Sequence, residues 1–356
     1  IEETGLILSE DILRSIIGEC AVQFILEKNG IKGKDNCLYR YIHGELPELK
    51  YSFLVDDIIS DKANIERLIK DNQRIFHHSF VYEPSEDVLG LLYISLKNIG
   101  DRKATGSYYT PTKVVQQLCN KLFSINSPIG KRVFDPCCGT GNFILQLPAA
   151  IGYEQVYGND IDALSVRIAR INYALKYDVY NPQIVYRHIT ESDYLSFGGE
   201  RKYDIIIGNP PWGYEFSDSQ KDLLRDKYAS ASGNSIESYD VFVEQALSNL
   251  KENGILSFVL PEAILNVKTH ASVRKVILSS CDFQYLEFLG NAFDKVQCPC
   301  IILQMLYKNA AFNVVYNKWV NDDNKQPFAT NDQKFKEFLT YIFDNTYYFN
   351  QAPSSN

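Results

Sequence analysis

The chain has 356 residues, of which 45% are hydrophobic and 22% are charged. This apolar content excludes a disordered chain, supplies a sizeable core and, at this length, predicts about two domains. The 36 basic and 44 acidic residues leave a net charge of −8. That balance excludes a broad basic surface that coats nucleic acid, but it is compatible with nucleic-acid binding in a local cleft.

The cellular setting is predicted from what the sequence lacks. No apolar run approaches the roughly 20 residues of a membrane span, and no signal peptide is recognised. None of the eight cysteines forms a Cys-x-x-Cys pair, so no metal site is predicted and reduced, buried thiols of a cytoplasmic protein are expected. Because the chain does not begin with Met, we also expect it to be a fragment of a longer protein.

The first segment, residues 1–105, is predicted to form a helical N-terminal domain. Apolar residues recur near a 3.6-residue period from Glu10 to Glu27, from Asp61 to Phe80 and from Ser85 to Leu96, with residues 85–87 as an N-terminal cap. Five of the eight excess negative charges fall in this segment. The acidic balance therefore belongs mainly to the predicted helical domain.

The middle of the chain alternates short β-rich runs with helical patterns. The expected strands are 131–134, 155–160, 183–188, 203–207 and 255–260, and the expected helices are 141–148, 163–177 and 240–251. This order predicts an α/β fold with a mostly parallel sheet covered by helices. Two further runs, 285–289 and 300–306, lie close together along the chain and predict an antiparallel edge.

A glycine-rich turn follows the first expected strand, in the segment Asp135-Pro-Cys-Cys-Gly139-Thr-Gly141. In a doubly wound sheet, such a turn binds a nucleotide-like ligand, and its glycines let the backbone approach that ligand. The third glycine of the dinucleotide fingerprint is replaced by Ile144, and the carboxylate of Asp135 suits a cationic group better than a pyrophosphate. The alternative interpretation is a tight turn without a ligand.

Further acids follow the next two expected strands. Asp160 ends the second strand 21 residues after Gly139, where a carboxylate can accept hydrogen bonds from ribose hydroxyls. Asp162 could share that role or cap the following helix, and the sequence leaves both open. Asp193 could accept a hydrogen bond from an adenine amino group, or could be a turn carboxylate.

The fourth strand leads directly into Asn209-Pro210-Pro211-Trp212. The prolines restrict the backbone and leave carbonyl oxygens as acceptors, while Asn209 adds a side-chain acceptor and Trp212 a flat aromatic face. Two acceptors beside an aromatic ring fit the exocyclic NH₂ group of a planar base. The alternative is a rigid turn with a packing tryptophan.

Together these motifs resemble the S-adenosylmethionine-dependent N6-adenine DNA methyltransferases of restriction–modification systems. The cofactor motif of that family matches residues 135–143, its catalytic (Asp/Asn)-Pro-Pro-(Tyr/Phe/Trp) motif matches 209–212, and its upstream Gly-x-Tyr-Tyr-Thr-Pro motif matches 106–111. Residues 87–93 also resemble the lead-in of those enzymes. The resemblance covers about residues 85 to 310 and implies a Rossmann-like methyltransferase sheet.

The order of the motifs resembles the gamma class of these enzymes, as found in types I and II. Only 15 residues, 194–208, separate the third acid from the catalytic motif, which is too few for a recognition domain. The resemblance therefore implies a methyltransferase domain over residues 106–310, followed by a C-terminal extension, residues 311–356, as the start of a target-recognition region.

The resemblance also implies roles for individual residues. It assigns S-adenosylmethionine binding to Tyr109, Thr110, Pro111, Asp135, Pro136, Gly139, Gly141, Asp160 and Asp193. It assigns catalysis to Asn209, Pro210, Pro211 and Trp212, with Trp212 and Phe293 stacking on the two faces of a flipped-out adenine. The match at Phe293 is looser, and a core phenylalanine is the alternative there. The resemblance implies double-stranded DNA as substrate, no metal, and a specificity or restriction subunit as a candidate partner.

Two departures from the family pattern leave alternatives open. Trp212 replaces the commoner Tyr or Phe, and the tail after residue 310 has only 46 residues, which is short for a recognition domain. The expected reaction is direct methyl transfer to adenine N6 after base flipping. The alternatives are methylation of RNA or of a protein glutamine amide, and a catalytically silent cofactor-binding subunit.

Overall fold

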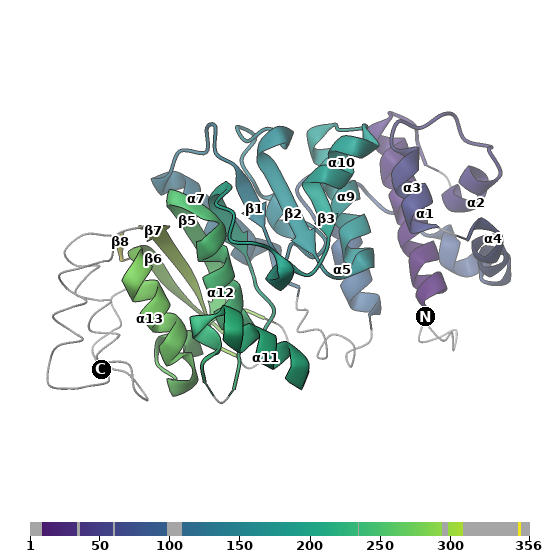
Figure 1. Ribbon diagram of the computed structural model, residues 1–356. Helices are drawn as coiled ribbons and strands as arrows, with labels where there is room; N and C mark the ends of the chain where they lie inside the picture. The colour runs from purple at the N-terminus through teal and green to yellow at the C-terminus, as the bar shows by residue number, and fades with distance from the viewer. Residues whose placement is uncertain are drawn as a thin grey trace, which may run out of the picture.

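The computed structural model describes residues 9–33, 36–59, 61–97, 109–233, 235–293, 298–308 and 348–349. The expected extension over 311–356 and the start of the upstream motif, residues 106–108, lie outside the described residues except for 348–349. Within the described part, an all-helical N-terminal segment stands beside a mixed sheet that is flanked by helices (Figure 1).

The N-terminal segment is helical where the apolar period predicts helices. Its elements are α1 (Glu10–Lys28), α2 (Cys37–Ile42), α3 (Ser52–Ile58), α4 (Lys62–Asp71), the 3₁₀ helix η2 (Gln73–His77) and α5 (Val88–Leu96). The single helix expected over 61–80 is divided, because α4 ends at Asp71 and the chain tightens into η2 after Asn72. The cap of α5 is Asp87 and not Ser85, since the Asp87 carboxylate accepts the N–H of Gly90 at 2.9 Å.

The sheet has the strand order β3-β2-β1-β4-β5-β7-β6-β8. The strands are β1 (Val133–Asp135), β2 (Val156–Asp160), β3 (Ile189–Glu191), β4 (Tyr203–Gly208), β5 (Leu250–Pro261), β6 (Cys281–Gly290), β7 (Cys300–Tyr307) and β8 (Tyr348–Phe349). Strands β1 to β5 pair in parallel, whereas β7 lies antiparallel between β5 and β6. The predicted α/β class with a mostly parallel sheet and an antiparallel portion is confirmed.

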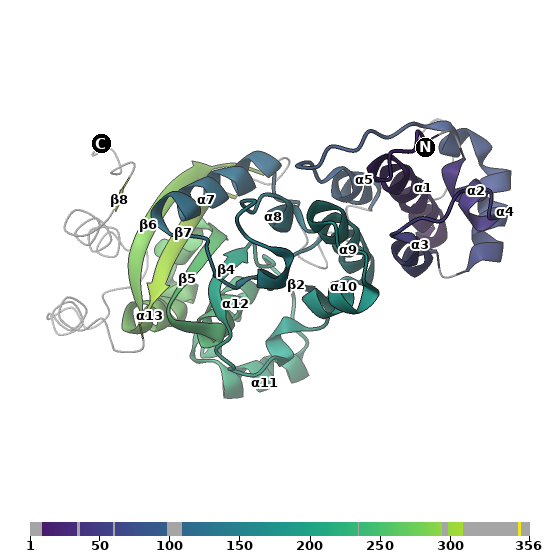
Figure 2. The ribbon, with the colours of Figure 1, turned by 90° about the horizontal axis from the view of Figure 1, so that it is seen from above.

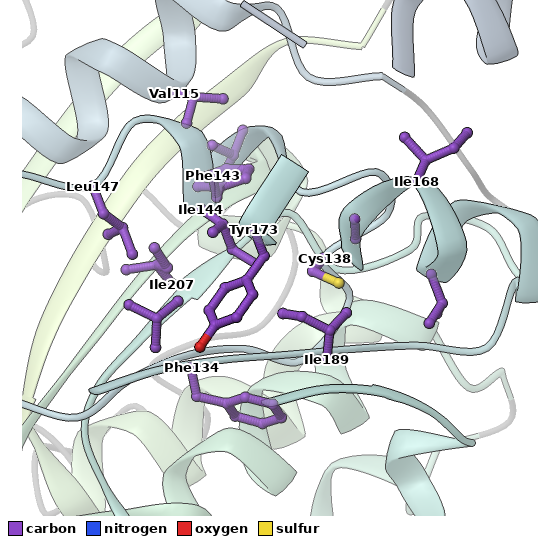
Figure 3. Close-up of a cluster of buried hydrophobic side chains, with 14 of the residues drawn as sticks. Val115, Phe134, Cys138, Phe143, Ile144, Leu147, Ile168, Tyr173, Ile189 and Ile207 are labelled. Carbon is purple, nitrogen blue, oxygen red and sulfur yellow. The ribbon is translucent and has the colours of Figure 1, made fainter. Parts of the chain in front are cut away.

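Helices cover both faces of this sheet. They are α7 (Thr112–Ile125), α8 (Asn142–Leu145), α9 (Ala163–Tyr177), α10 (Pro182–His188), α11 (Asp218–Lys227), α12 (Ser238–Asn249) and α13 (Ala271–Ser280), with short 3₁₀ helices η3 to η7 between them. Figure 2 shows α7, α8 and α9 on one face and α12 and α13 on the other. Apolar side chains from the sheet and from α8 and α9 form the core between them, as the labelled residues in Figure 3 show.

One predicted strand is wrong: residues 183–188 form helix α10, and the third strand is the short β3 that follows it. The Asn181 side chain accepts the N–H of Gln183 at 3.0 Å, and Pro182 occupies the first helical turn. An Asn-Pro pair therefore starts a helix here, and this capping outweighs the β preference of the branched residues that follow.

The N-terminal helices pack on α9, at the β3 side of the sheet. Arg170 of α9 donates to the Asp57 carboxylate at 3.1 Å, and the Tyr51 hydroxyl donates to Asp178 just beyond α9.

No helix of the described residues is long and apolar enough to cross a membrane. All eight cysteines are described, and none of them is in a disulfide.

Candidate functional site

A cavity of about 590 Å³ opens at the carboxyl ends of β1, β2 and β4, a size typical of small-molecule sites. The predicted residues that line it are Tyr109, Thr110, Pro136, Gly139, Asp160, Asp193, Asn209, Pro210, Pro211 and Trp212. The predicted residues that do not line it are Pro111, Asp135, Gly141 and Phe293. Pro111 instead occupies the N-cap position of α7. The fold thus brings residues of the predicted cofactor and catalytic motifs into one cavity.

The glycine loop has the backbone conformation that its sequence predicts. Gly139 and Gly141 both have positive φ, at +51° and +93°, which side-chain-bearing residues rarely adopt. A Cβ on Gly141 would also lie 3.4 Å from the Ala169 backbone of α9. The loop N–H of Gly139 donates to the Asp160 carboxylate at 2.8 Å, so the loop and the end of β2 are joined.

Asp135, at the end of β1, is a buried carboxylate with one oxygen available. Its Oδ1 accepts the N–H of Cys137 at 3.1 Å, while Oδ2 has no hydrogen-bond partner among the described residues. Burial raises the pKa of Asp135 well above its usual value. A Cβ on Gly208 would lie 2.6 Å from Oδ1, the oxygen that Cys137 already holds, so the glycine that ends β4 allows the strand to approach that side of the carboxylate. A cationic group reaching Oδ2 would therefore stabilise the ionised carboxylate.

The two acids near the end of β2 have different roles. Both oxygens of Asp160 accept backbone N–H groups, from Gly139 at 2.8 Å and Asp162 at 2.9 Å, and Asp160 lines the cavity. Asp162 caps α9, accepting the N–H groups of Leu164 and Ser165 at 3.0 Å. Asp162 also lines the cavity, but its Oδ1 is taken by these α9 N–H groups and its Oδ2 by Tyr93 and Lys97. The structure therefore favours the capping role for Asp162 and leaves Asp160 as the better candidate for a ligand.

Asp193 is a turn carboxylate that also lies at the cavity wall. Its carboxylate caps the short helix η4 (Tyr194–Ser196) by accepting the Leu195 N–H at 3.0 Å, and the exposed residue also lines the cavity. A turn carboxylate with free lone pairs at the cavity wall can still accept a hydrogen bond from an amino group.

Asn209 follows β4, and its amide is held from one side. Its Nδ2 donates to the Thr110 hydroxyl at 3.0 Å. The carbonyl oxygen of Thr110 in turn accepts a hydrogen bond from the Asn142 side-chain amide at 2.8 Å. The opposite atom, Asn209 Oδ1, is buried and has no partner among the described residues. Because a buried acceptor without a partner is costly, this oxygen is the clearest sign of an absent donor in the site.

A serine that sequence reasoning missed holds the second proline of the catalytic motif. The hydroxyl of Ser238, at the start of α12, donates to the Pro211 carbonyl oxygen and accepts the Tyr214 N–H at 3.4 Å. The Pro211 carbonyl is therefore occupied, which leaves the Pro210 carbonyl as the candidate acceptor beside Asn209. No local pattern marks Ser238, since it lies 27 residues from Pro211.

Trp212 and Phe293, which are expected to stack on the two faces of a flipped base, contact each other directly in this structure. Their ring centroids lie 4.8 Å apart with planes inclined by 70°, which is an edge-to-face contact. Both rings are buried, and Phe293 does not line the cavity. A planar base does not fit between rings in this contact, so stacking on both of its faces stays a prediction in which the two rings separate.

The sequence analysis also did not identify two exposed apolar side chains that line the cavity. Ile161, directly after Asp160, is 66% exposed, and Leu223 of α11 is 70% exposed; both line the cavity. Such apolar surface can be covered by a flat ring of a ligand. The position of Ile161 after a strand-end acid is a usable sequence signal, whereas Leu223 reaches the cavity through the placement of α11.

In the described part of the chain, no group of three His, Cys, Asp or Glu side chains could hold a metal.

The family model and the curated proteins that this chain resembles are all DNA methylases. The model of the N-6 DNA methylase family matches residues 85–344. Similar proteins include the type II methyltransferase M.VspI of Vibrio sp. (strain 343), 25% identical over 81% of this chain and 72% of that protein. The modification methylase CviBIII of Paramecium bursaria Chlorella virus NC1A is 29% identical in a match that covers 49% of this chain and 42% of that protein.

Solved structures share the fold. A complex of DrdV with DNA matches 84% of this chain and 36% of that one, with a TM-score of 0.58 and 17% identity. A modification subunit assigned to a type I restriction enzyme of Vibrio vulnificus YJ016 matches 94% of this chain and 84% of that one, with a TM-score of 0.55 and 16% identity.

Proposed function

The chain belongs to the N-6 DNA methylase family, and from this premise we propose that it transfers a methyl group from S-adenosylmethionine to N6 of a flipped-out adenine in DNA. Family membership confirms the class of enzyme predicted from the sequence, an N6-adenine methyltransferase of the restriction–modification type. The observation that carries the residue-level proposal is the buried, partnerless Oδ1 of Asn209 at the cavity.

The described residues fit S-adenosylmethionine, which supplies a methyl group activated on a sulfonium. We assign its amino group to Oδ2 of Asp135, which is buried next to the cavity-lining Pro136 and has no partner among the described residues. We assign its ribose hydroxyls to Asp160 and its adenine amino group to Asp193. Ile161 offers apolar surface for the adenine ring. Tyr109 and Thr110, which line the same cavity, would contact the methionine end.

The chain supplies hydrogen-bond acceptors for the adenine amine. In our proposal, Asn209 Oδ1 and the Pro210 carbonyl accept the two N–H bonds of the amine, orient its lone pair and stabilise the positive charge that develops on nitrogen. Pro211 fixes the turn, and its own carbonyl is taken by Ser238. Flipping a base costs a few kcal/mol, and stacking on Trp212 at about 1–3 kcal/mol offsets part of that cost.

Partners and setting remain part of the proposal. The chain spans about two fifths of several curated relatives, some of which are methylase subunits of type I restriction enzymes. With a net charge of −8, the chain lacks the positive charge that supplies most duplex affinity. We propose that a specificity or restriction subunit supplies it, and that the protein acts in the cytoplasm.

The test is methyl transfer from tritiated S-adenosylmethionine to matched samples of duplex DNA, RNA and protein. We expect incorporation into DNA, with label recovered as N6-methyladenine and mapped to one site class by sequencing. Label in RNA or in a glutamine amide would replace the DNA assignment. Cofactor binding without transfer to any substrate would favour a silent cofactor-binding subunit.

Phe293 gives a second prediction, because it contacts Trp212, the ring that we propose stacks on the base. Replacing Phe293 with leucine removes the edge-to-face contact and keeps an apolar side chain. We expect the fluorescence of a 2-aminopurine target to change at saturating enzyme, with altered target stacking and little change in cofactor affinity. An unchanged signal together with wild-type turnover would remove Phe293 from the target pocket and leave it a core residue.

A further inference from the structure

The helix α5 reaches the cofactor cavity at two separate points, although it belongs to the helical N-terminal segment. At its start, the Asp87 side chain meets the glycine loop at Thr140. At its end, Tyr93 and Lys97 meet Asp162 beside the strand-end acid. Neither contact follows from the roles assigned above, so α5 requires its own explanation.

The first contact is fully buried. The Thr140 hydroxyl donates to Asp87 Oδ2, and the Asn172 side chain donates to Asp87 Oδ1 and to the Thr140 carbonyl oxygen, both at 2.8 Å. Thr140 lies between Gly139 and Gly141, whose backbones are free to adopt many conformations. Holding both the hydroxyl and the carbonyl of Thr140 removes that freedom before a ligand binds, so the loop is preorganised.

The close approach at this contact depends on Gly90. A Cβ at that position would lie 2.0 Å from Asp87 Oδ2 and 2.2 Å from the Thr140 hydroxyl. Glycine inside a helix costs roughly 1 kcal/mol relative to alanine, so its presence in α5 is explained by the room that it leaves for this pair.

The second contact acts on the end of β2. The Tyr93 hydroxyl donates to Asp162 Oδ2 at 2.8 Å and Lys97 donates to the same oxygen at 2.6 Å. The Asp162 N–H in turn donates to Asp160 Oδ1 at 2.9 Å. The helix thereby fixes the residue whose backbone holds the proposed ribose acid.

We propose that α5 is a positioning element of the cofactor site, in which Asp87 sets the glycine loop through Thr140, and Tyr93 with Lys97 set Asp160 through Asp162. This inference rests on the proposed function, because it takes S-adenosylmethionine as the ligand. The helical N-terminal segment is then a working part of the cofactor site. None of these α5 side chains is required to touch the reacting atoms.

The test measures cofactor affinity by calorimetry with S-adenosylhomocysteine, which binds without reacting. Asp87→Asn and Thr140→Val are each expected to weaken binding by roughly tenfold. The double variant should be little weaker than either single variant, because both remove the same hydrogen bond. Thr140→Ser keeps the hydroxyl and is expected to retain near-wild-type affinity.

Steady-state kinetics separate positioning from a general loss of structure. The KM for S-adenosylmethionine should rise with the dissociation constant, while kcat at saturating cofactor stays within about twofold of the wild type. Ser95→Ala, an exposed change on the same helix, is the matched control and should leave both unchanged. Unchanged affinity in Asp87→Asn and Thr140→Val, or fully additive losses, would overturn the inference.

A second pair of variants covers the case in which Asp87→Asn does not fold. Tyr93→Phe and Lys97→Met remove the partly exposed contacts to Asp162, and each is expected to raise the dissociation constant several-fold, whereas wild-type affinity in both would contradict the proposal. If the wild type binds S-adenosylhomocysteine but does not methylate DNA, the proposed function fails while these affinity comparisons still decide the role of α5.

Discussion

Replacing Asn209 with alanine is expected to lower the rate of methyl transfer at saturating cofactor by about 100- to 1,000-fold, the usual cost of removing one preorganised polar group that stabilises developing charge. The Oδ1 atom of Asn209 is buried without a partner among the described residues, so its lost interaction is one that forms only with the substrate amine. Single-turnover transfer from tritiated cofactor to DNA measures the effect directly.

Two comparisons make this result specific. Cofactor affinity should change by less than about threefold, because Asn209 contacts the amine and not the proposed cofactor groups. Asn209→Asp keeps an acceptor and matches the other residue that the family motif allows, so it is expected to retain much of the rate. Near-normal methylation by Asn209→Ala, with cofactor binding intact, would refute the catalytic role.

The second large effect is expected at Asp135. Asp135→Asn preserves the shape but removes the charge that we pair with the cofactor amino group, and the loss of a buried charged partner costs about 3 kcal/mol. The dissociation constant for S-adenosylmethionine should therefore rise about 100-fold. Asp193→Asn, at the exposed acid of the other cavity end, is the matched control and should weaken binding far less.

The pH dependence of binding tests the same assignment. Burial raises the pKa of Asp135 above its ordinary value, so the free protein holds a proton on this carboxyl until the pH passes that raised value. An ammonium group binds the ionised form, so affinity should increase as the pH rises and a proton should be released on binding. Burial also raises the pKa of Asp160, so this residue contributes in the same direction. Asp135→Asn should flatten the profile, and an identical slope in that variant would assign the proton to another group.

The elements that the sequence predicted well are those governed by residues close together along the chain. The strand, glycine turn and short helix from Val133 to Leu145 follow from a buried run, two glycines and the apolar residues after them, all within one short segment. The strand leading into Asn209 is determined in the same way by its apolar residues and two prolines. The sequence prediction missed helix α10 although its signal is local. It relied on the β preference of the branched residues and not on the Asn181-Pro182 helix start.

The roles of several side chains could not be predicted, because each depends on a partner far away in the sequence. Asp162 could have been a ribose acid or a helix cap, and the contacts from Tyr93 and Lys97, 69 and 65 residues away, accompany the cap. The free oxygen of Asn209 is defined by Thr110, 99 residues upstream, which takes the amide donor.

By itself, the sequence determined the α/β class, the family and the positions of the cofactor and catalytic motifs, because these depend on local patterns of apolar residues, glycines and prolines. Only the tertiary structure decided which polar atoms remain available to a ligand and which are occupied: Asp135 and Asn209 keep an oxygen without a partner in the described part, whereas the Pro211 carbonyl is bonded to Ser238. It also placed Asp87 against Thr140 and Phe293 against Trp212. The physical reason is that a hydrogen bond or ring contact depends on distances in space, which chain spacing does not specify across packed elements.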